Sequence, residues 1–385
     1  MALKKASRGL IPPFIVMDVM RAASDREAKG EDVLHLEVGQ PGTAAPGRVA
    51  EAVKAAVDEH LLGYTLAFGL PALQDRIARH YHDHYHCDIP TDRIAVTTGS
   101  SGAFVLSFLA AFDPGDRVAL ASPGYPAYRN ILTAVGVEVV DLLTGPEDNF
   151  QPTAAHLERE IETTGSLDGL IVASPSNPTG TMITPPQLKE LIDCCAAHDI
   201  RLVSDEIYHG ITYGTAAETA ARFSSDVIVI NSFSKYFSMT GWRLGWMIVP
   251  EDLVRAVECL AQNLFISPPT LSQIAGIAAF DCMEELDGNV ERYAANRELL
   301  LNELPKAGFN RLASADGAFY IYADVSEMTN DSPAFCRRLL AETGIAATPG
   351  TDFDPSRGHR FVRFSFAREY PMIAEAARRL KEWRR

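Results

Sequence analysis

The chain has 385 residues, of which 47% are hydrophobic and 22% are charged, and its formal net charge is −15. This length predicts about two domains, and the composition is that of an ordinary globular protein. The acidic balance argues against nucleic acid as a partner, because such a surface repels a polyanion.

The beginning of the chain lacks the charged head and apolar core of a secretory signal, and no apolar run reaches the roughly 20 residues of a membrane span. The six cysteines are scattered without the spacing of a disulfide framework, which favours free thiols in a reducing compartment. We therefore expect a cytoplasmic protein that has no membrane partner.

Short apolar runs rich in β-branched residues alternate with amphipathic stretches through the middle of the chain. The runs cover residues 94–98, 117–121, 169–173, 201–204 and 227–230. Runs of this kind are typical of strands buried on both faces, and residues 185–198 have the apolar spacing of a covering helix. The pattern predicts an α/β fold with a mostly parallel central sheet flanked by helices, in which functional groups collect at the strand ends.

The pattern changes near residue 285, where a long charged helix over 290–304 precedes strands over 317–323 and 360–366. We interpret residues 1–45 as an N-terminal arm and part of a small domain. Residues 46–285 would form the large domain and residues 286–385 the rest of the small domain. The smaller α+β domain would thus be built from both chain ends.

Lys235 lies directly after a predicted strand, in the segment Asn231-Ser-Phe-Ser-Lys-Tyr-Phe-Ser-Met-Thr-Gly-Trp-Arg-Leu-Gly245. A lysine at such a place can be desolvated, which lowers its pKa and provides the neutral amine that a Schiff base with an aldehyde requires. Arg243 offers a planar fork of donors suited to a phosphate, and Ser232 and Ser234 can add hydroxyl donors. Ser-Phe-Ser-Lys alone would be typical of an exposed loop, whereas the longer string is far more specific.

This string resembles the lysine signature of class I/II aminotransferases of fold type I, the aspartate aminotransferase superfamily, which depend on pyridoxal 5'-phosphate (PLP). Further motifs follow in that family's order from about Pro12 to Arg363. The resemblance implies an aminotransferase that moves an amino group from an amino acid to a 2-oxo acid through a PLP Schiff base on Lys235. It also implies that the freed lysine is the general base and that 2-oxoglutarate is the usual acceptor.

Three motifs at strand ends would hold the cofactor ring. The resemblance implies that Asp205, in Val-Ser-Asp-Glu-Ile-Tyr, keeps the pyridine nitrogen protonated, and that Tyr208 and Asn177 donate to the phenolate oxygen. Tyr125, in Ser-Pro-Gly-Tyr-Pro, would stack on the ring. In isolation these residues could be a helix N-cap, an interior tyrosine, an Asn-Pro turn and a structural aromatic residue.

The cofactor phosphate would lie at the turn Thr98-Gly-Ser-Ser-Gly-Ala103, because a turn that opens a helix presents several backbone N–H groups to an anion. By resemblance, Ser100 and Ser101 supply these contacts. Tyr64, in Gly-Tyr-Thr, would reach the phosphate of the neighbouring subunit, so that a homodimer shares its active sites. Each of these sequences is an ordinary turn when taken alone.

The substrate α-carboxylate would be bound by Arg363, which lies on an apolar, alternating strand where an unpaired charge is costly. A structural salt bridge is the alternative. Gly39, in Glu-Val-Gly-Gln-Pro, and Asn177 would help to seat the same group by resemblance. We expect Phe14 and Ile15 to line the pocket and to favour an apolar side chain, although the sequence does not identify the amino donor.

Two rival functions use the same fold. β-Lyases of sulfur amino acids share these residues, and only product analysis separates them from aminotransferases. PLP-sensing transcription regulators carry an N-terminal winged-helix module, whereas the motifs here begin close to the start of the chain. The acidic composition also argues against the regulator.

A histidine-rich stretch between His80 and His86 resembles a metal site, because His80 and His84, like His82 and His86, have the i,i+4 spacing of helical ligands. The two pairs lie on different faces of the expected helix. We therefore expect the polar end of an ordinary helix and no bound metal.

Overall fold

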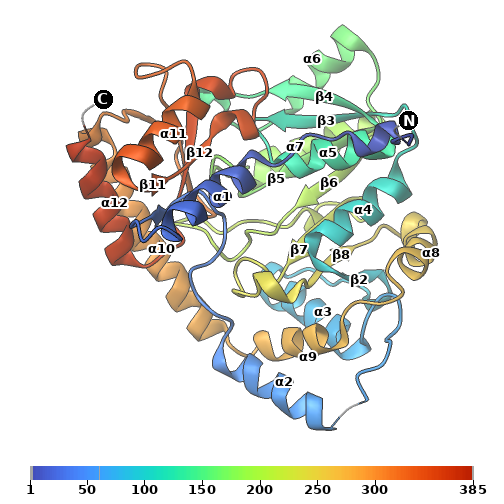
Figure 1. Ribbon diagram of the computed structural model, residues 1–385. Coiled ribbons are helices and arrows are strands. Elements are labelled where there is room, and N and C mark those ends of the chain that lie inside the picture. The colour runs from blue at the N-terminus through green and yellow to red at the C-terminus, as the bar shows by residue number, and fades with distance from the viewer. Residues whose placement is uncertain (1–2, 60, 384–385) are drawn as a thin grey trace.

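The computed structural model describes residues 3–59 and 61–383, so the outermost residues of the predicted 1–45 and 286–385 regions lie outside it. The chain forms a large α/β unit and a smaller α+β unit to which both chain ends contribute (Figure 1). This arrangement confirms the predicted fold class.

The large unit is built on a seven-stranded sheet in which only β8 runs against its neighbours. In spatial order the strands are β2 (Ile94–Thr97), β8 (Gly245–Ile248), β7 (Ile228–Ser232), β6 (Arg201–Asp205), β5 (Gly169–Ala173), β3 (Arg117–Ser122) and β4 (Glu138–Leu143). Five of these strands were predicted, each within two residues of its observed ends.

Helices cover both faces of this sheet, which is why its strands are apolar on both sides. In β5, Leu170 and Val172 pack in one core, whereas Ile171 between them packs in the other. The first core includes residues of α2 (Gly47–Glu59), α3 (Pro71–Tyr85), α6 (Ala154–Thr164), α7 (Pro185–Ala197) and α9 (Thr270–Ala279). The second includes residues of α4 (Gly99–Ala111), α5 (Pro126–Val135) and α8 (Val254–Leu264).

The smaller unit contains an antiparallel sheet in the order β12 (Thr348–Pro349), β13 (Phe361–Ser365), β10 (Tyr320–Asp324) and β9 (Arg311–Leu312). A parallel pair of β1 (Leu34–His35) and β11 (Ile345–Ala346) joins the N-terminal segment to the C-terminal one. Around them lie α1 (Ile15–Glu27), α10 (Met283–Glu303), α11 (Ser332–Thr343) and α12 (Tyr370–Glu382) (Figure 1).

Two details of the predicted elements differ from the structure. The strand predicted over 317–323 begins only at Tyr320, because Ala318 has a φ of +54°, which extended backbone does not accommodate. The charged helix predicted over 290–304 starts seven residues earlier, at Met283.

The histidine-rich stretch forms the end of α3, where His82 pairs with Asp88 and His84 contacts the carbonyl of His80. Within the described residues, no cluster of His, Cys, Asp and Glu side chains could hold a metal ion. None of the helices in the described part of the chain is both long and apolar enough to cross a bilayer.

Candidate active site

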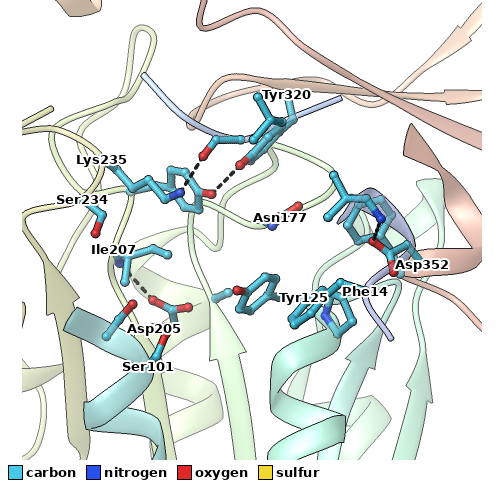
Figure 2. Close-up of a pocket in the computed structure, with 18 of the residues that line it drawn as sticks. Phe14, Ser101, Tyr125, Asn177, Asp205, Ile207, Ser234, Lys235, Tyr320 and Asp352 are labelled. Carbon is cyan, nitrogen blue, oxygen red and sulfur yellow. Dashed lines mark hydrogen bonds between the residues drawn. The ribbon is translucent and has the colours of Figure 1, made fainter. Parts of the chain in front are cut away.

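A cavity of about 270 Å³ lies where the carboxyl ends of the central strands face the smaller unit. Most of the residues singled out in the sequence line it. They are Gly39, Ser100, Ser101, Tyr125, Asn177, Asp205, Tyr208, Ser234, Lys235, Arg243 and Arg363. Figure 2 shows Lys235, Asp205 and Tyr125 turned toward the same space.

The amine of Lys235 lies inside this cavity, three residues after the end of β7. Its Nζ donates a hydrogen bond to the backbone carbonyl of Gly39 at 2.6 Å (Figure 2). Removal from bulk water, and next the positive charge of Arg363, lower the pKa of Lys235 to about 8. A large fraction of this amine is therefore neutral near pH 8, as nucleophilic attack requires.

Asp205 is the last residue of β6 and is buried at the bottom of the cavity. Its Oδ1 accepts a hydrogen bond from the backbone N–H of Ile207 at 3.0 Å, and its Oδ2 accepts one from the hydroxyl of Tyr128. Burial raises the pKa of Asp205 to about 6, and both donors act in the opposite direction by favouring the carboxylate. The site therefore contains a buried carboxylate that a cationic partner would stabilise.

Tyr208 and Tyr320 both line the cavity, and their hydroxyl groups share a hydrogen bond with the oxygens 2.6 Å apart. The Tyr320 hydroxyl also explains why residue 39 is glycine, since a Cβ atom there would lie only 1.8 Å from that oxygen. Tyr320 was not among the predicted residues; the signal in the sequence was its place on an apolar strand, two residues before Tyr322, where a buried tyrosine hydroxyl needs a hydrogen-bond partner.

A candidate anion site lies at the first turn of α4, where the backbone N–H groups of Ser100 and Ser101 have no partner within the helix. Thr98, at the N-cap, makes no capping hydrogen bond with its side chain. The guanidinium of Arg243 closes the other side, and a Cβ atom at Gly99 would lie 2.6 Å from its Nη2. Helix dipole, N–H groups and guanidinium together suit a phosphate dianion.

A second candidate anion site surrounds Arg363, whose side chain is buried. Its Nη1 donates to Oδ1 of Asn177 at 2.8 Å, and its Nη2 donates to the carbonyl of Glu37 and to Oγ1 of Thr348. None of these partners is a carboxylate, and its Nε has no acceptor among the described residues. A buried guanidinium that makes no salt bridge with any of the described residues favours a carboxylate ligand over the structural salt bridge.

Three predicted positions do not line the cavity. Ser232 lies behind Ser234 and donates its hydroxyl hydrogen to it at 2.9 Å, so Ser232 orients Ser234 rather than facing the cavity. Tyr64 is 83% exposed and lies outside the cavity of its own chain. The side chain of Ile15 lines a neighbouring cavity instead, because it points to the other side of α1 from Val16.

One wall of the cavity comes from the start of α1 and is apolar. Its residues are Phe14, Val16, Met17 and Met20, and Phe353 from the smaller unit adds to the same wall. Phe14 also contacts Tyr125, with the ring centroids 5.9 Å apart. Of these residues only Phe14 was predicted, because the sequence of α1 does not show that this helix covers a cavity built from residues far along the chain.

Comparisons with known proteins agree with this geometry. Residues 31–380 match the family model described as aminotransferase class I and II. The chain is 52% identical to a valine–pyruvate aminotransferase of Mycobacterium tuberculosis, over 98% of each chain. These matches establish the family of the chain. The chain belongs to the class I and II aminotransferases.

Solved structures lead to the same conclusion about this aminotransferase. A crystal structure of an aminotransferase from Mycobacterium tuberculosis superimposes with a TM-score of 0.97 at 52% identity, and 99% of each chain is covered. An aspartate aminotransferase from Thermus thermophilus with maleate gives a TM-score of 0.92 at 30% identity, over 99% of this chain and 100% of that one. Transfer of an amino group is therefore its activity, and the β-lyase alternative is not favoured.

Proposed function

We propose that this aminotransferase binds PLP in the cavity and that Lys235 is its covalent anchor. The observation that carries the proposal is the grouping of four charged side chains around one space. Lys235 and Asp205 lie between two anion sites, at Arg243 and at Arg363. A PLP molecule with a bound amino acid offers the matching groups, namely an aldehyde, a basic ring nitrogen, a phosphate and a carboxylate.

The phosphate of the cofactor would bind at the α4 N-terminus, between the Ser100–Ser101 turn and Arg243. Ser234 lines the same part of the cavity and adds a hydroxyl donor. Asp205 would pair with the ring nitrogen, and this cationic partner would offset the cost of burying its carboxylate. Tyr125 lies beside this space and offers its ring for stacking.

Asn177 would serve both cofactor and substrate. Its amide oxygen is used by Arg363, which leaves the amide nitrogen as a donor to the cofactor oxygen beside Tyr208. Arg363 would bind the substrate α-carboxylate through the part of its guanidinium that lacks an acceptor. The backbone of Gly39 borders the same position through its contact with Lys235.

When bound, PLP supplies an electron-withdrawing ring that makes the α-proton of an amino acid acidic. Lys235 is the group on this chain that can accept the proton, because its Nζ is neutral near pH 8 and lies inside the cavity. Arg363 holds the carboxylate end of the substrate, which limits the orientations of the carbon that carries this proton. The chain thus contributes positioning, a base and charge stabilisation.

The amino donor would have an apolar side chain and a single carboxylate. The α1 wall offers the side chains of Phe14, Val16, Met17 and Met20, and no basic residue beyond Lys235, Arg243 and Arg363 lines the cavity among the described residues. The valine–pyruvate aminotransferase relative is named for substrates of this kind. We therefore propose valine as donor and pyruvate as acceptor for the first assays, with 2-oxoglutarate as the comparison acceptor.

The enzyme would work as a homodimer with shared active sites. Leu61, Tyr64, Leu66, Leu264 and Ile266 are large and exposed, with Leu61 97% exposed. Their two segments adjoin, because Thr270 donates to the carbonyl of Gly63 at 2.6 Å. Exposed apolar residues grouped into a patch in this way are typical of a subunit interface. Tyr64 of the partner subunit would then reach the phosphate site.

A reducing compartment such as the cytoplasm would suit the chain, since all six cysteines are free thiols.

The variant Lys235→Ala tests the proposed function. We expect it to lose the absorbance band of the lysine-linked cofactor and at least about a thousandfold in turnover, since the group that anchors the cofactor and moves the proton is gone. Its circular dichroism spectrum should match that of the wild type. A variant that keeps the band and transfers amino groups at the original rate would refute the assignment.

A further inference from the structure

The apolar α1 wall is attached to the smaller unit by one buried carboxylate. Oδ1 of Asp352 accepts a hydrogen bond from the backbone N–H of Ile15 at 2.9 Å, and Oδ2 accepts one from Val16 at 3.2 Å. Asp352 is 8% exposed and lines the active-site cavity (Figure 2). The contact therefore joins residues that are 337 and 336 positions apart at the edge of the substrate pocket.

These two N–H groups are the unpaired donors that open every α-helix. The residue at the N-cap of α1 is Phe14, whose side chain makes no capping hydrogen bond. Asp352 therefore replaces a local cap, and its negative charge lies at the positive end of the helix dipole. The start of α1 has no local polar cap to hold it if this carboxylate is removed.

Asp352 also lies at the boundary between two cavities. A second cavity of about 420 Å³ runs under the N-terminal arm, where Pro12 and Pro13 line it. It shares Tyr125, Pro126, Tyr128, Asp352 and Phe353 with the active-site cavity. Displacement of the first turn of α1 would thus change the volume open to a substrate side chain.

The charges around the active-site cavity leave Asp352 without a role in the proposed function. The charged lining residues are Asp205, Lys235, Arg243, Asp352 and Arg363. The first three and Arg363 are accounted for by the cofactor and the α-carboxylate. Asp352 remains as a carboxylate beside the apolar wall, where a second carboxylate on a substrate would meet like charge in a poorly solvated place.

We propose that Asp352 is a positioning residue that sets donor specificity. Its carboxylate holds the first turn of α1 as the wall of the side-chain pocket and repels the second carboxylate of an acidic amino donor. This inference rests on the proposed function, because it assumes that the amino donor binds against that wall.

Two variants separate the attachment of α1 from the repulsion of a second carboxylate. Asp352→Asn removes the charge and leaves one oxygen acceptor, so we expect the KM for valine to rise about tenfold while kcat stays within about twofold. The preference for valine over glutamate, as a ratio of kcat/KM values, should fall about tenfold. Asp352→Glu keeps the charge but displaces it, so it should raise the KM for valine and still reject glutamate.

Hydrogen–deuterium exchange tests the attachment without any turnover. Residues 14–20 should exchange faster in both Asp352 variants than in the wild type, because their first hydrogen bonds are lost or displaced. Asp25→Asn is the matched control, since this exposed carboxylate lies in the same helix, beyond its first turn, and does not line the cavity. Its kinetics and exchange should equal those of the wild type.

The proposal is overturned if Asp352→Asn affects valine and glutamate by the same factor, or if exchange in residues 14–20 does not change. Failure of the proposed function would look different. In that case wild-type enzyme would show no loss of the lysine-linked absorbance band on addition of valine, whereas the exchange result would still report on the contact between Asp352 and α1.

Discussion

The hydroxyl of Tyr128 donates a hydrogen bond to Oδ2 of Asp205 beneath the cavity. Tyr128 belongs to the first turn of α5, three residues after Tyr125, so a single helix start supplies both the predicted stacking ring and a donor to the carboxylate. The bond favours the ionised form of Asp205 and partly opposes the effect of burial. Tyr128 thus helps to maintain the charge that the proposed cofactor site needs.

Tyr128→Phe should lower kcat/KM for the amino donor about tenfold, because a hydrogen bond to a charged group contributes about 1.5–3 kcal/mol. The acid limb of the pH–rate profile should also move to higher pH, since the Asp205 carboxylate is less favoured. Steady-state kinetics across pH provide the measurement. Tyr322→Phe is the control, because that buried hydroxyl has no partner among the described residues and lies outside the cavity. An unchanged profile for Tyr128→Phe would contradict the assigned role.

Asp205→Asn should stabilise the cofactor-free protein at neutral pH. The folded-state pKa of about 6 lies above the ordinary value of 3.8, so the folded chain binds this proton more tightly than the unfolded chain does. Stability is therefore lost as pH rises from about 4 to about 6, by about 3 kcal/mol at most. Asparagine does not ionise, so the advantage of the variant should grow over this range and then level off.

Chemical unfolding of both proteins at several pH values measures this difference. Asp354→Asn is a control whose stability should depend on pH in the opposite direction. Burial acts to raise the pKa of Asp354, but hydrogen bonds from Arg357 and Ser356 outweigh it and lower that pKa. Its wild-type carboxylate stabilises the fold above about pH 4, and this contribution disappears on acidification. A stability difference for Asp205→Asn that does not vary with pH would contradict the raised pKa of Asp205.

The rate at which PLP recombines with the cofactor-free enzyme should rise with pH and reach half its maximum near pH 8. The neutral amine is the reactive form, and the pKa of Lys235 is lowered to about 8 from the ordinary 10.5. Arg363→Gln should move this midpoint upward, because the positive charge of Arg363 helps to lower the pKa. Arg360→Gln is the control, since Arg360 is paired with Asp324. A midpoint near 10.5 in the wild type would contradict the lowered pKa of Lys235.

Ile266→Glu should produce monomers that bind PLP at least about tenfold more weakly, because a charge in the apolar patch prevents association and removes the partner's Tyr64. Sedimentation velocity and a cofactor titration measure the two effects. Tyr64→Phe should weaken cofactor binding without changing the sedimentation coefficient. Leu143→Glu is the control, because Leu143 is 52% exposed at the end of β4, an edge strand of the large sheet, and does not belong to the apolar patch. Monomers of Ile266→Glu that keep full cofactor affinity would exclude a shared site.

The sequence alone determined the parts of this protein that depend on neighbouring residues. The short apolar runs specified strands buried on both faces, because alternate residues such as Leu170 and Ile171 must pack against helices on opposite sides. The polar residues directly after these runs, among them Asp205 and Lys235, had to lie at one edge of a parallel sheet. The fold class follows from this local pattern, whereas the roles expected of the residues at that edge came from the resemblance to the aminotransferase family.

Only the tertiary structure decided which distant residues complete the cavity. Asp352 reaches the start of α1 across 337 positions, and Arg363 meets Asn177 across 186. Such contacts depend on how the smaller unit packs against the sheet, and a period of two or of 3.6 residues contains no information about that. The same reason explains Ser232, which is the last residue of β7 but whose side chain lies behind Ser234 instead of facing the cavity.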